Sequence, residues 1–396
     1  MIRFIMSAGT MTRPVFFTGL CLVFTLMTCI SSPCIAGEPG PASEVPVLAE
    51  AGSFSSPAAG SGLVVTDARG KEVTLSGVPH RIVITGKASF MVVDAVYLFP
   101  AVWSRVVGLN KEGMGTGGQG MDAFLAAIDP GYASKTTLGR EAGPEQIAAA
   151  KPDVVLMKKA STENLGRSLE EIGIPVVCVD FETPEQYDRD LAILGCLLGQ
   201  ETRAKEIAKL IHARLARIEN KLAVIDEAKK PKVLLLYYSS RDGSIAYNVP
   251  PKSWIQTLLV KMAGGRPLWD GIELGQGWTK VGFEQIAAWD PDQVFIVSYF
   301  DEYGKVMKDL LADERWQALR AVKSNKIWIF PRDLISWDQP DPRWVLGLEW
   351  LASKIHPDLF PGVDMKAEVI GFFRDFYDVD ADAVKKGILP ALHGDL

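Results

Sequence analysis

Side chains that could bind a small molecule follow several short apolar runs of the 396-residue chain. Runs such as 154–157 and 233–237 are typical of buried strands. In open α/β sheets, ligands lie beyond the carboxyl ends of the strands. The residues that follow these runs, or lie near them, combine cations, hydroxyls and aromatic rings. The candidate ligand-binding residues are Lys87, Ser89, Lys158, Tyr238, Ser239, Arg241, Trp278, Tyr299, Arg332 and Trp337.

This mixture of side chains favours binding over bond-making chemistry. Aromatic faces can pack on a planar or apolar ligand, and Lys and Arg can pair with its carboxylates or with a metal oxyanion. The chain has no Gly-x-Ser-x-Gly motif and no assembled nucleophile, base and acid, which argues against the alternative of an exported α/β enzyme. We expect no cofactor.

The sequence also argues against a bare metal ion as the ligand. A site built from imidazole and carboxylate needs several clustered ligands. The four histidines, at 80, 212, 356 and 393, fall in different predicted elements. We therefore expect no direct metal site, and a metal would reach the protein already chelated.

The glycine-rich segment at 113–120 provides an alternative ligand chemistry. Backbone amides of such loops can form anion-binding nests, which would make molybdate or tungstate a candidate ligand. The segment lacks the Lys-[Ser/Thr] ending of a phosphate-binding loop. A flexible loop at the edge of the ligand site is the favoured interpretation.

The elements that would position these residues alternate along the chain. Helical stretches separate most of the strand-like runs, which predicts βαβ units around mostly parallel sheets. An amphipathic helix is predicted over 201–229, because Ile207, Ile211 and Ile218 recur at helical spacing and Pro231 stops it. A β-hairpin is expected at 63–75. The strand-like runs are 81–84, 106–109, 154–157, 176–179, 233–237, 294–297 and 327–330.

An internal repeat divides this pattern into two halves. The segment GPEQIAAAKPDVV at 143–155 recurs 139 residues later as GFEQIAAWDPDQV at 282–294, with nine of 13 positions identical. Each copy predicts a short helix, a Pro-Asp turn and a buried strand. A repeat of domain size indicates two similar lobes, here joined by the long central helix.

The first 36 residues have the features of an export signal. Arg3 and Arg13 are their only charged residues, and the apolar stretch 15–30 is followed by small residues. The stretch is shorter than the roughly 20 residues of a membrane-spanning helix. An uncleaved anchor and a lipid attached to Cys29 are weaker alternatives. Residues 37–62, rich in Pro, Gly, Ala and Ser, are predicted to be a flexible linker.

Removal of the signal makes the chain more acidic. The whole chain has 42 Lys and Arg against 48 Asp and Glu, a net charge of −6. Without Arg3 and Arg13 the charge is 40 − 48 = −8, which argues against a general nucleic-acid binder. Only Cys178 and Cys196 remain, and their apolar surroundings predict two buried free thiols.

Several motifs together resemble the periplasmic substrate-binding proteins of ABC importers, in the class that binds iron–siderophore complexes, haem and cobalamin. They are the export signal, TDARGK at 66–71, PHRIV at 79–83, the doubled Glu-Gln-Ile and Pro-Asp motif, the central helix and LGLEWLA at 346–352. The resemblance covers roughly residues 63–361, and its motifs do not specify one ligand.

The resemblance implies a periplasmic carrier and not an enzyme. Two Rossmann-like lobes with mostly parallel sheets would be joined by one long rigid α-helix and would close only slightly on the ligand. Glu145 and Glu284, one on each lobe, would dock on a dimeric ABC permease. The membrane would be met only through the permease or a lipid anchor. The implied division is signal 1–36, linker 37–62, N-terminal lobe 63–200, interlobe helix 201–230, C-terminal lobe 231–361 and helical tail 362–396.

Overall fold

The computed structural model describes residues 62–111, 119–240 and 244–396. The predicted export signal, most of the linker, most of the glycine-rich segment and Arg241 lie outside these ranges. The predicted hairpin is confirmed, since β1 (Leu63–Thr66) pairs antiparallel with β2 (Glu72–Leu75). In the described ranges, no helix combines the length and the apolar character needed to cross a membrane.

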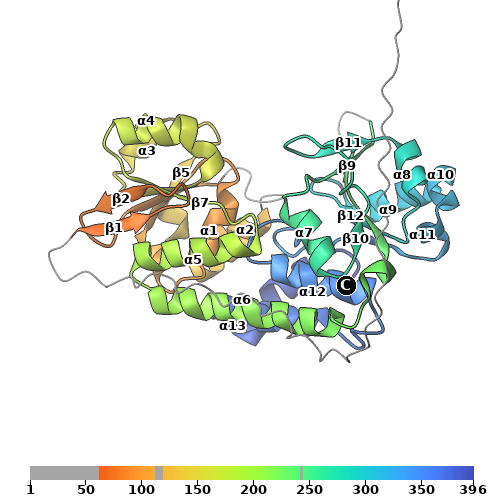
Figure 1. Ribbon diagram of the computed structural model, residues 1–396. Helices are drawn as coiled ribbons and strands as arrows, with labels where there is room; N and C mark the ends of the chain where they lie inside the picture. The colour runs from red at the N-terminus through yellow and green to blue at the C-terminus, as the bar shows by residue number, and fades with distance from the viewer. Residues whose placement is uncertain (1–61, 112–118, 241–243) are drawn as a thin grey trace, which may run out of the picture. The chain divides into compact units, whose positions relative to one another are not determined.

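The first lobe is built on a five-stranded parallel sheet with strand order β5-β4-β3-β6-β7. It is the part of Figure 1 that carries the labels β5 and β7. Strands β3, β6 and β7 are short and fully buried, as expected for a sheet covered on both faces. The strands are β3 (Ile82–Ile84), β4 (Val106–Asn110), β5 (Thr136–Leu138), β6 (Val154–Lys158) and β7 (Val176–Val179). The helices are α1 (Ser89–Val96), α2 (Gln119–Ile128), α3 (Pro144–Ala149), α4 (Arg167–Glu171) and α5 (Pro184–Leu198).

The second lobe has a mixed sheet with strand order β11-β9-β8-β12-β13, and β10 pairs with β8. Strands β8, β12 and β13 are parallel to one another, as predicted. The strands are β8 (Lys232–Ser239), β9 (Ala246–Val249), β10 (Arg266–Pro267), β11 (Thr279–Val281), β12 (Gln293–Val297) and β13 (Ile327–Ile329). The helices are α7 (Ile255–Met262), α8 (Phe283–Trp289), α9 (Tyr303–Ala312), α10 (Glu314–Ala318), α11 (Arg320–Lys323) and α12 (Trp344–Ile355).

The internal repeat has the same chemical role in both lobes. In the first copy, the Asp153 carboxylate accepts the backbone N–H of Arg81 at 2.9 Å, just before β3. In the second copy, the Asp292 carboxylate accepts the N–H of Lys232 at 2.8 Å, at the start of β8. Each Pro-Asp turn therefore fixes the entry of the neighbouring parallel strand, which gives the repeated Asp the same structural role in both copies.

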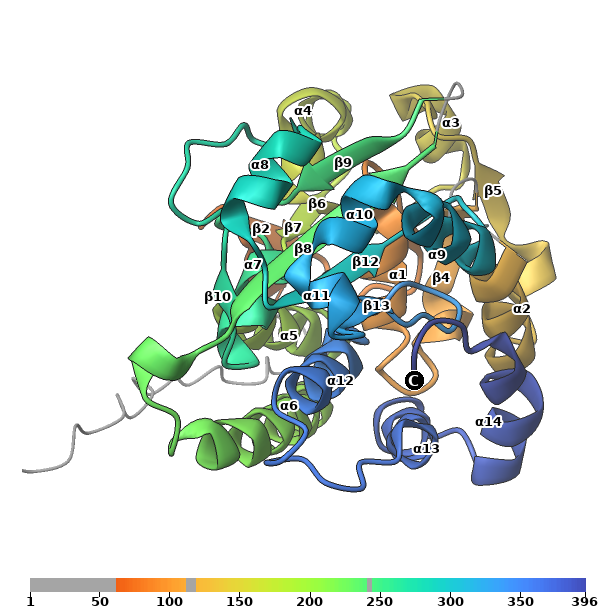
Figure 2. The same cartoon turned by 90° about the vertical axis from the view of Figure 1, so that its right-hand side faces the viewer.

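The central helix α6 (Glu201–Leu222) packs on α5 of the first lobe and α12 of the second (Figures 1 and 2). It ends at Leu222, earlier than the predicted residue 229. The chain continues into a short 3-10 turn at Glu227–Lys229, whose start is capped by the Asp226 carboxylate. Val224 is exposed, so the apolar spacing that buries the helix stops at this point.

The C-terminal tail contacts α1 of the first lobe and α12 of the second. Helix α13 (Met365–Tyr377) is followed by α14 (Ala381–Gly387). The Tyr377 hydroxyl donates to Asp94 of α1 at 2.7 Å, and Arg203 at the start of α6 donates to the Phe376 carbonyl at 2.7 Å. The tail therefore links elements of the two lobes.

Both described cysteines are buried free thiols, as predicted. Cys178 lies in the fully buried strand β7. Burial, reinforced by the nearby Asp67 carboxylate, raises the pKa of the Cys178 thiol to about 12. A thiol with such a pKa is unreactive at neutral pH, because the thiolate is the reactive form.

Candidate functional site

Four aromatic rings meet beside the carboxyl ends of β8 and β12. Tyr237 lies 4.9 Å from Tyr299 and 5.2 Å from Trp278, measured between ring centroids, and Trp254 lies 5.8 Å from Trp278. All four side chains are only partly buried. These four residues are termed the aromatic cluster. Because each of the four residues keeps an exposed part, the cluster is a candidate apolar surface for a ligand.

The inner end of this cluster is anchored on a buried acid. The Tyr299 hydroxyl donates to Oδ2 of Asp338 at 2.6 Å, and Gln256 at the start of α7 donates to the same oxygen at 3.1 Å. Burial and the Asp338 carboxylate raise the pKa of the Tyr299 hydroxyl well above its usual value. Tyr299 therefore stays a neutral donor at all physiological pH values.

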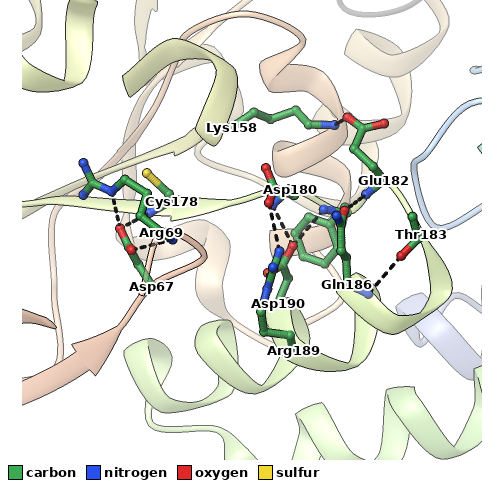
Figure 3. Close-up of polar contacts among 11 residues, drawn as sticks. Asp67, Arg69, Lys158, Cys178, Asp180, Glu182, Thr183, Gln186, Arg189 and Asp190 are labelled. Atoms are coloured by element: carbon green, nitrogen blue, oxygen red, sulfur yellow. Dashed lines mark hydrogen bonds and ion pairs between the residues drawn. The ribbon is translucent and has the colours of Figure 1, made fainter. Parts of the chain in front are cut away.

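On the first lobe, the Lys158 ammonium at the end of β6 pairs with the Glu182 carboxylate, which follows β7 (Figure 3). Lys158 is buried, and its Nζ also lies 3.5 Å from Sδ of Met91 in α1. The pairing neutralises the Lys158 ammonium, which was predicted from the sequence to bind an anionic ligand. A ligand carboxylate would have to compete with Glu182 for this ammonium.

The loop that carries Glu182 is held by short-range hydrogen bonds (Figure 3). The Asp190 carboxylate accepts the backbone N–H groups of Asp180 and Phe181 at 2.6 and 2.7 Å. The Gln186 side chain accepts the N–H of Glu182 at 2.8 Å. These bonds fix the backbone where β7 ends, so Glu182 is held opposite Lys158 before any ligand arrives.

Other predicted residues of the first lobe lie at the same sheet edge with different exposure. Lys87 is exposed, and its backbone N–H donates to the Ser161 hydroxyl at 2.8 Å. Ser89 is buried as the first residue of α1.

In the second lobe, the aromatic cluster brings together two predicted residues, Trp278 and Tyr299. Tyr238 is buried, and its ring packs on Tyr247 with 6.3 Å between the centroids, away from the cluster. Ser239 is half-buried at the end of β8, and Trp337 is fully buried. Arg332 is half-buried, with its guanidinium 4.5 Å above the ring of Tyr303.

Three residues of the site were missed by the sequence reasoning: Tyr237, Trp254 and Asp338. Tyr237 lies inside β8 and not after it, so a search for residues beyond strand ends passes over it. Trp254 precedes α7 and Asp338 lies in the long segment between β13 and α12. The aromatic spacing around 237–254 was the available signal, but it does not identify which rings meet.

The segment after β13 also reaches the first lobe through a buried ion network. The fully buried Arg343 guanidinium pairs with Asp94 of α1, and its Nε lies 2.8 Å from Oδ1 of Asp333. Nearby, the rings of Tyr187 of α5 and Trp344 of α12 have centroids 5.6 Å apart. These contacts join the lobes next to the segment that supports the aromatic cluster.

Glu145 and Glu284 occupy equivalent places in the two lobes. Each is exposed and is the second residue of a short helix, α3 or α8. Each carboxylate turns back toward the glycine that precedes its helix. A β-carbon placed on Gly143 would lie 3.2 Å from Oε2 of Glu145, and one placed on Gly282 would lie 3.1 Å from Oε2 of Glu284. A carboxylate there is also favoured by the positive end of the helix dipole. This local effect is by itself sufficient to explain why a Glu stands at each of the two positions.

Within the described residues, no three His, Cys, Asp or Glu side chains are grouped so that they could hold a metal ion. The carboxylates of the ion network around Arg343 are instead grouped around a guanidinium.

Comparison with known proteins gives the same architecture. The molybdate-binding protein MolA of Haemophilus influenzae is 23% identical over 258 residues, which cover 59% of this chain and 69% of that protein. The vitamin B12-binding protein of Salmonella typhi is 25% identical over 217 residues, covering 53% of this chain and 72% of that protein. A periplasmic solute-binding protein from Veillonella parvula superimposes with a TM-score of 0.66 at 24% identity, covering 83% of this chain and 96% of that chain.

The model of one protein family, described as periplasmic binding protein, matches residues 116–334. The match spans more than half of the chain and includes both copies of the internal repeat. The two-lobe α/β fold predicted from the sequence agrees with this assignment. The chain therefore belongs to the periplasmic binding protein family.

Proposed function

We propose that this protein binds a metal chelate, namely an iron–siderophore complex, haem or a corrinoid, in the periplasm and delivers it to an ABC import permease. The supporting observation is the aromatic cluster of four partly exposed residues. Three of its rings contact one another, and the fourth, Trp254, contacts Trp278. Such a surface suits the planar or apolar face of an organic chelate. The relatives are binding proteins of transport systems and not enzymes, in keeping with a carrier role.

The ligand is tested by titration calorimetry of the purified protein with haemin, cyanocobalamin, a ferric catecholate siderophore and molybdate. We expect one of the three chelates to bind in the micromolar range or tighter. The Trp278→Ala variant should weaken that binding at least tenfold, because it removes the ring that contacts three others. Trp289→Ala is the matched control, a half-buried Trp at the opposite end of β12. Chelate binding that is unaffected by Trp278→Ala would contradict this site.

Binding of molybdate is the second candidate, supported by the similarity to MolA. An oxyanion is held by hydrogen-bond donors and cations, so its affinity should not depend on Trp278. Molybdate binding that survives Trp278→Ala, with no chelate binding, would replace the main proposal by this one.

We also propose that Glu145 and Glu284 dock on the permease. Their exposure and their matched positions in the two lobes support a symmetric contact with two permease subunits. Exposed charges of this kind steer docking and fix its register more than they add affinity. The double variant Glu145→Ala/Glu284→Ala should abolish uptake but leave ligand affinity unchanged.

The matched control is Gln146→Ala/Gln285→Ala, which alters the exposed neighbours in both helices. Uptake should be retained in this control. A loss of ligand affinity in the Glu double variant would assign these residues to the fold or to the ligand site instead of to docking.

A further inference from the structure

Asp338 is a fully buried carboxylate that lies beneath the aromatic cluster. It accepts three hydrogen bonds from neutral donors: the Tyr299 hydroxyl, the Gln256 amide and the Ser336 hydroxyl. Within the described ranges it forms no ion pair with Lys or Arg. Burial raises the pKa of the Asp338 carboxyl, while the three donors act in the opposite direction.

A buried carboxylate without a cation is costly, and its cost is lowered only while its donors stay in place. The carboxylate therefore holds each donor firmly. Of the three donors, only Tyr299 belongs to the aromatic cluster. Its hydroxyl end is held inside the protein and its ring contacts Tyr237 and Trp278, at 4.9 and 6.3 Å between centroids.

We propose that Asp338 is a positioning residue for ligand binding, because it fixes the orientation of the Tyr299 ring and thereby pre-organises the aromatic cluster. A ring held at its hydroxyl end and packed against two neighbours has little freedom left. Binding then costs less conformational entropy than it would on four loosely held rings. The role in binding rests on the proposed function, but the effect on the ring does not.

Three variants separate positioning from a general effect on stability. Tyr299→Phe keeps the ring and removes its anchor, and Asp338→Asn weakens the anchor while keeping the shape. Ser336→Ala is the matched control, because it also removes one donor from the carboxylate but leaves the hydrogen bond of the Tyr299 hydroxyl in place. All three should lower the thermal midpoint, so stability alone does not distinguish them.

The first measurement needs no ligand. Near-ultraviolet circular dichroism of the free protein reports the fixed packing of Tyr and Trp rings. Tyr299→Phe and Asp338→Asn should both reduce the signal of the cluster, and Ser336→Ala should leave it close to that of the wild type. An unchanged spectrum in Asp338→Asn, or an equal change in Ser336→Ala, would overturn the proposal.

The second measurement is the affinity for whichever probe binds the wild type among haemin, cyanocobalamin and the ferric catecholate. We expect Tyr299→Phe and Asp338→Asn to weaken binding about 3- to 10-fold, the range of one lost hydrogen bond, and Ser336→Ala to weaken it less than twofold. Equal losses in all three variants would show a merely structural role. If no probe binds the wild type, the proposed function fails, whereas the dichroism still decides whether Asp338 positions the ring.

Discussion

The ion network around Arg343 gives the sharpest test of how the two lobes are coupled. Arg343 is fully buried between Asp94 of the first lobe and Asp333 and Asp341 of the second. The perturbation is Arg343→Met, which keeps much of the side-chain length and removes the charge. Three buried carboxylates would then share no cation.

The expected loss follows from this geometry. Removal of one partner from a buried ion pair costs about 3–5 kcal/mol, because the remaining charge is left uncompensated. The carboxylates can reduce this cost by taking up protons. Burial already raises the pKa values of Asp94 and Asp341, and Arg343 acts to lower both. Without Arg343 these pKa values should rise further.

The pH dependence follows from this rise. A carboxyl whose pKa is higher in the folded state than in the unfolded state makes folding less favourable as the pH rises above the unfolded value. The deficit of Arg343→Met should therefore be largest at pH 8 and smaller at pH 5. In the wild type, the cation offsets this effect, so its stability should change less over the same interval.

The assay is urea unfolding at pH 5 and pH 8, followed by tryptophan fluorescence. Arg374→Met is the control, since Arg374 is exposed and pairs with its neighbour Asp375, and it should not differ measurably from the wild type. The double variant Arg343→Met/Asp94→Asn should recover part of the loss, because it removes one of the uncompensated charges. A loss below about 1 kcal/mol, or one that is equal at both pH values, would refute this account of the network.

Three further predictions concern other parts of the fold. Asp292→Ala should lower the free energy of unfolding by about 1 kcal/mol, because the N–H of Lys232 loses its acceptor at the entry of β8, and urea titration measures this loss. Cys178 should not react with iodoacetamide in the native protein at pH 8, because the thiol is buried and its pKa is raised to about 12. It should react in urea, and mass spectrometry of the labelled peptides checks both states. Tyr377→Phe should speed amide exchange in α1, since it removes the hydrogen bond from the tail to Asp94.

The parts of the fold that depend on local chemistry could be predicted from the sequence. The Pro-Asp turns are an example, because the short helix, the turn and the next strand lie within a few residues of one another in each copy of the repeat. The strand that each Asp side chain caps is distant in sequence, 72 or 60 residues earlier, and was not predicted. The parallel strands were also recognisable, since buried strands are continuous apolar runs. The end of the central helix was misplaced, because the apolar spacing stops at Leu222. The short strands β5, β9, β10 and β11 were not among the predicted runs.

The composition of the ligand site was harder to predict, because it depends on which face each side chain takes. Tyr237 and Tyr238 are adjacent in β8, and successive residues of a strand point to opposite faces. The sequence selected Tyr238, whereas Tyr237 carries the ring that joins the cluster. Lys158 could be placed at a strand end, but its pairing with Glu182 depends on two strands meeting in space.

The coupling of the lobes determines whether affinity arises from contacts formed on closure or from a surface that is ordered before the ligand binds. Helix α6 is joined to the second lobe and the tail by Arg214, which contacts Glu349 of α12 at 2.8 Å and Glu368 of α13 at 3.4 Å. Together with the Arg343 network, these contacts restrict movement of one lobe against the other. A carrier with little closure gains few new contacts when the ligand arrives. Its affinity then depends on a surface that is already ordered, which gives the anchoring of Tyr299 by Asp338 more weight here than in a protein whose lobes close around the ligand.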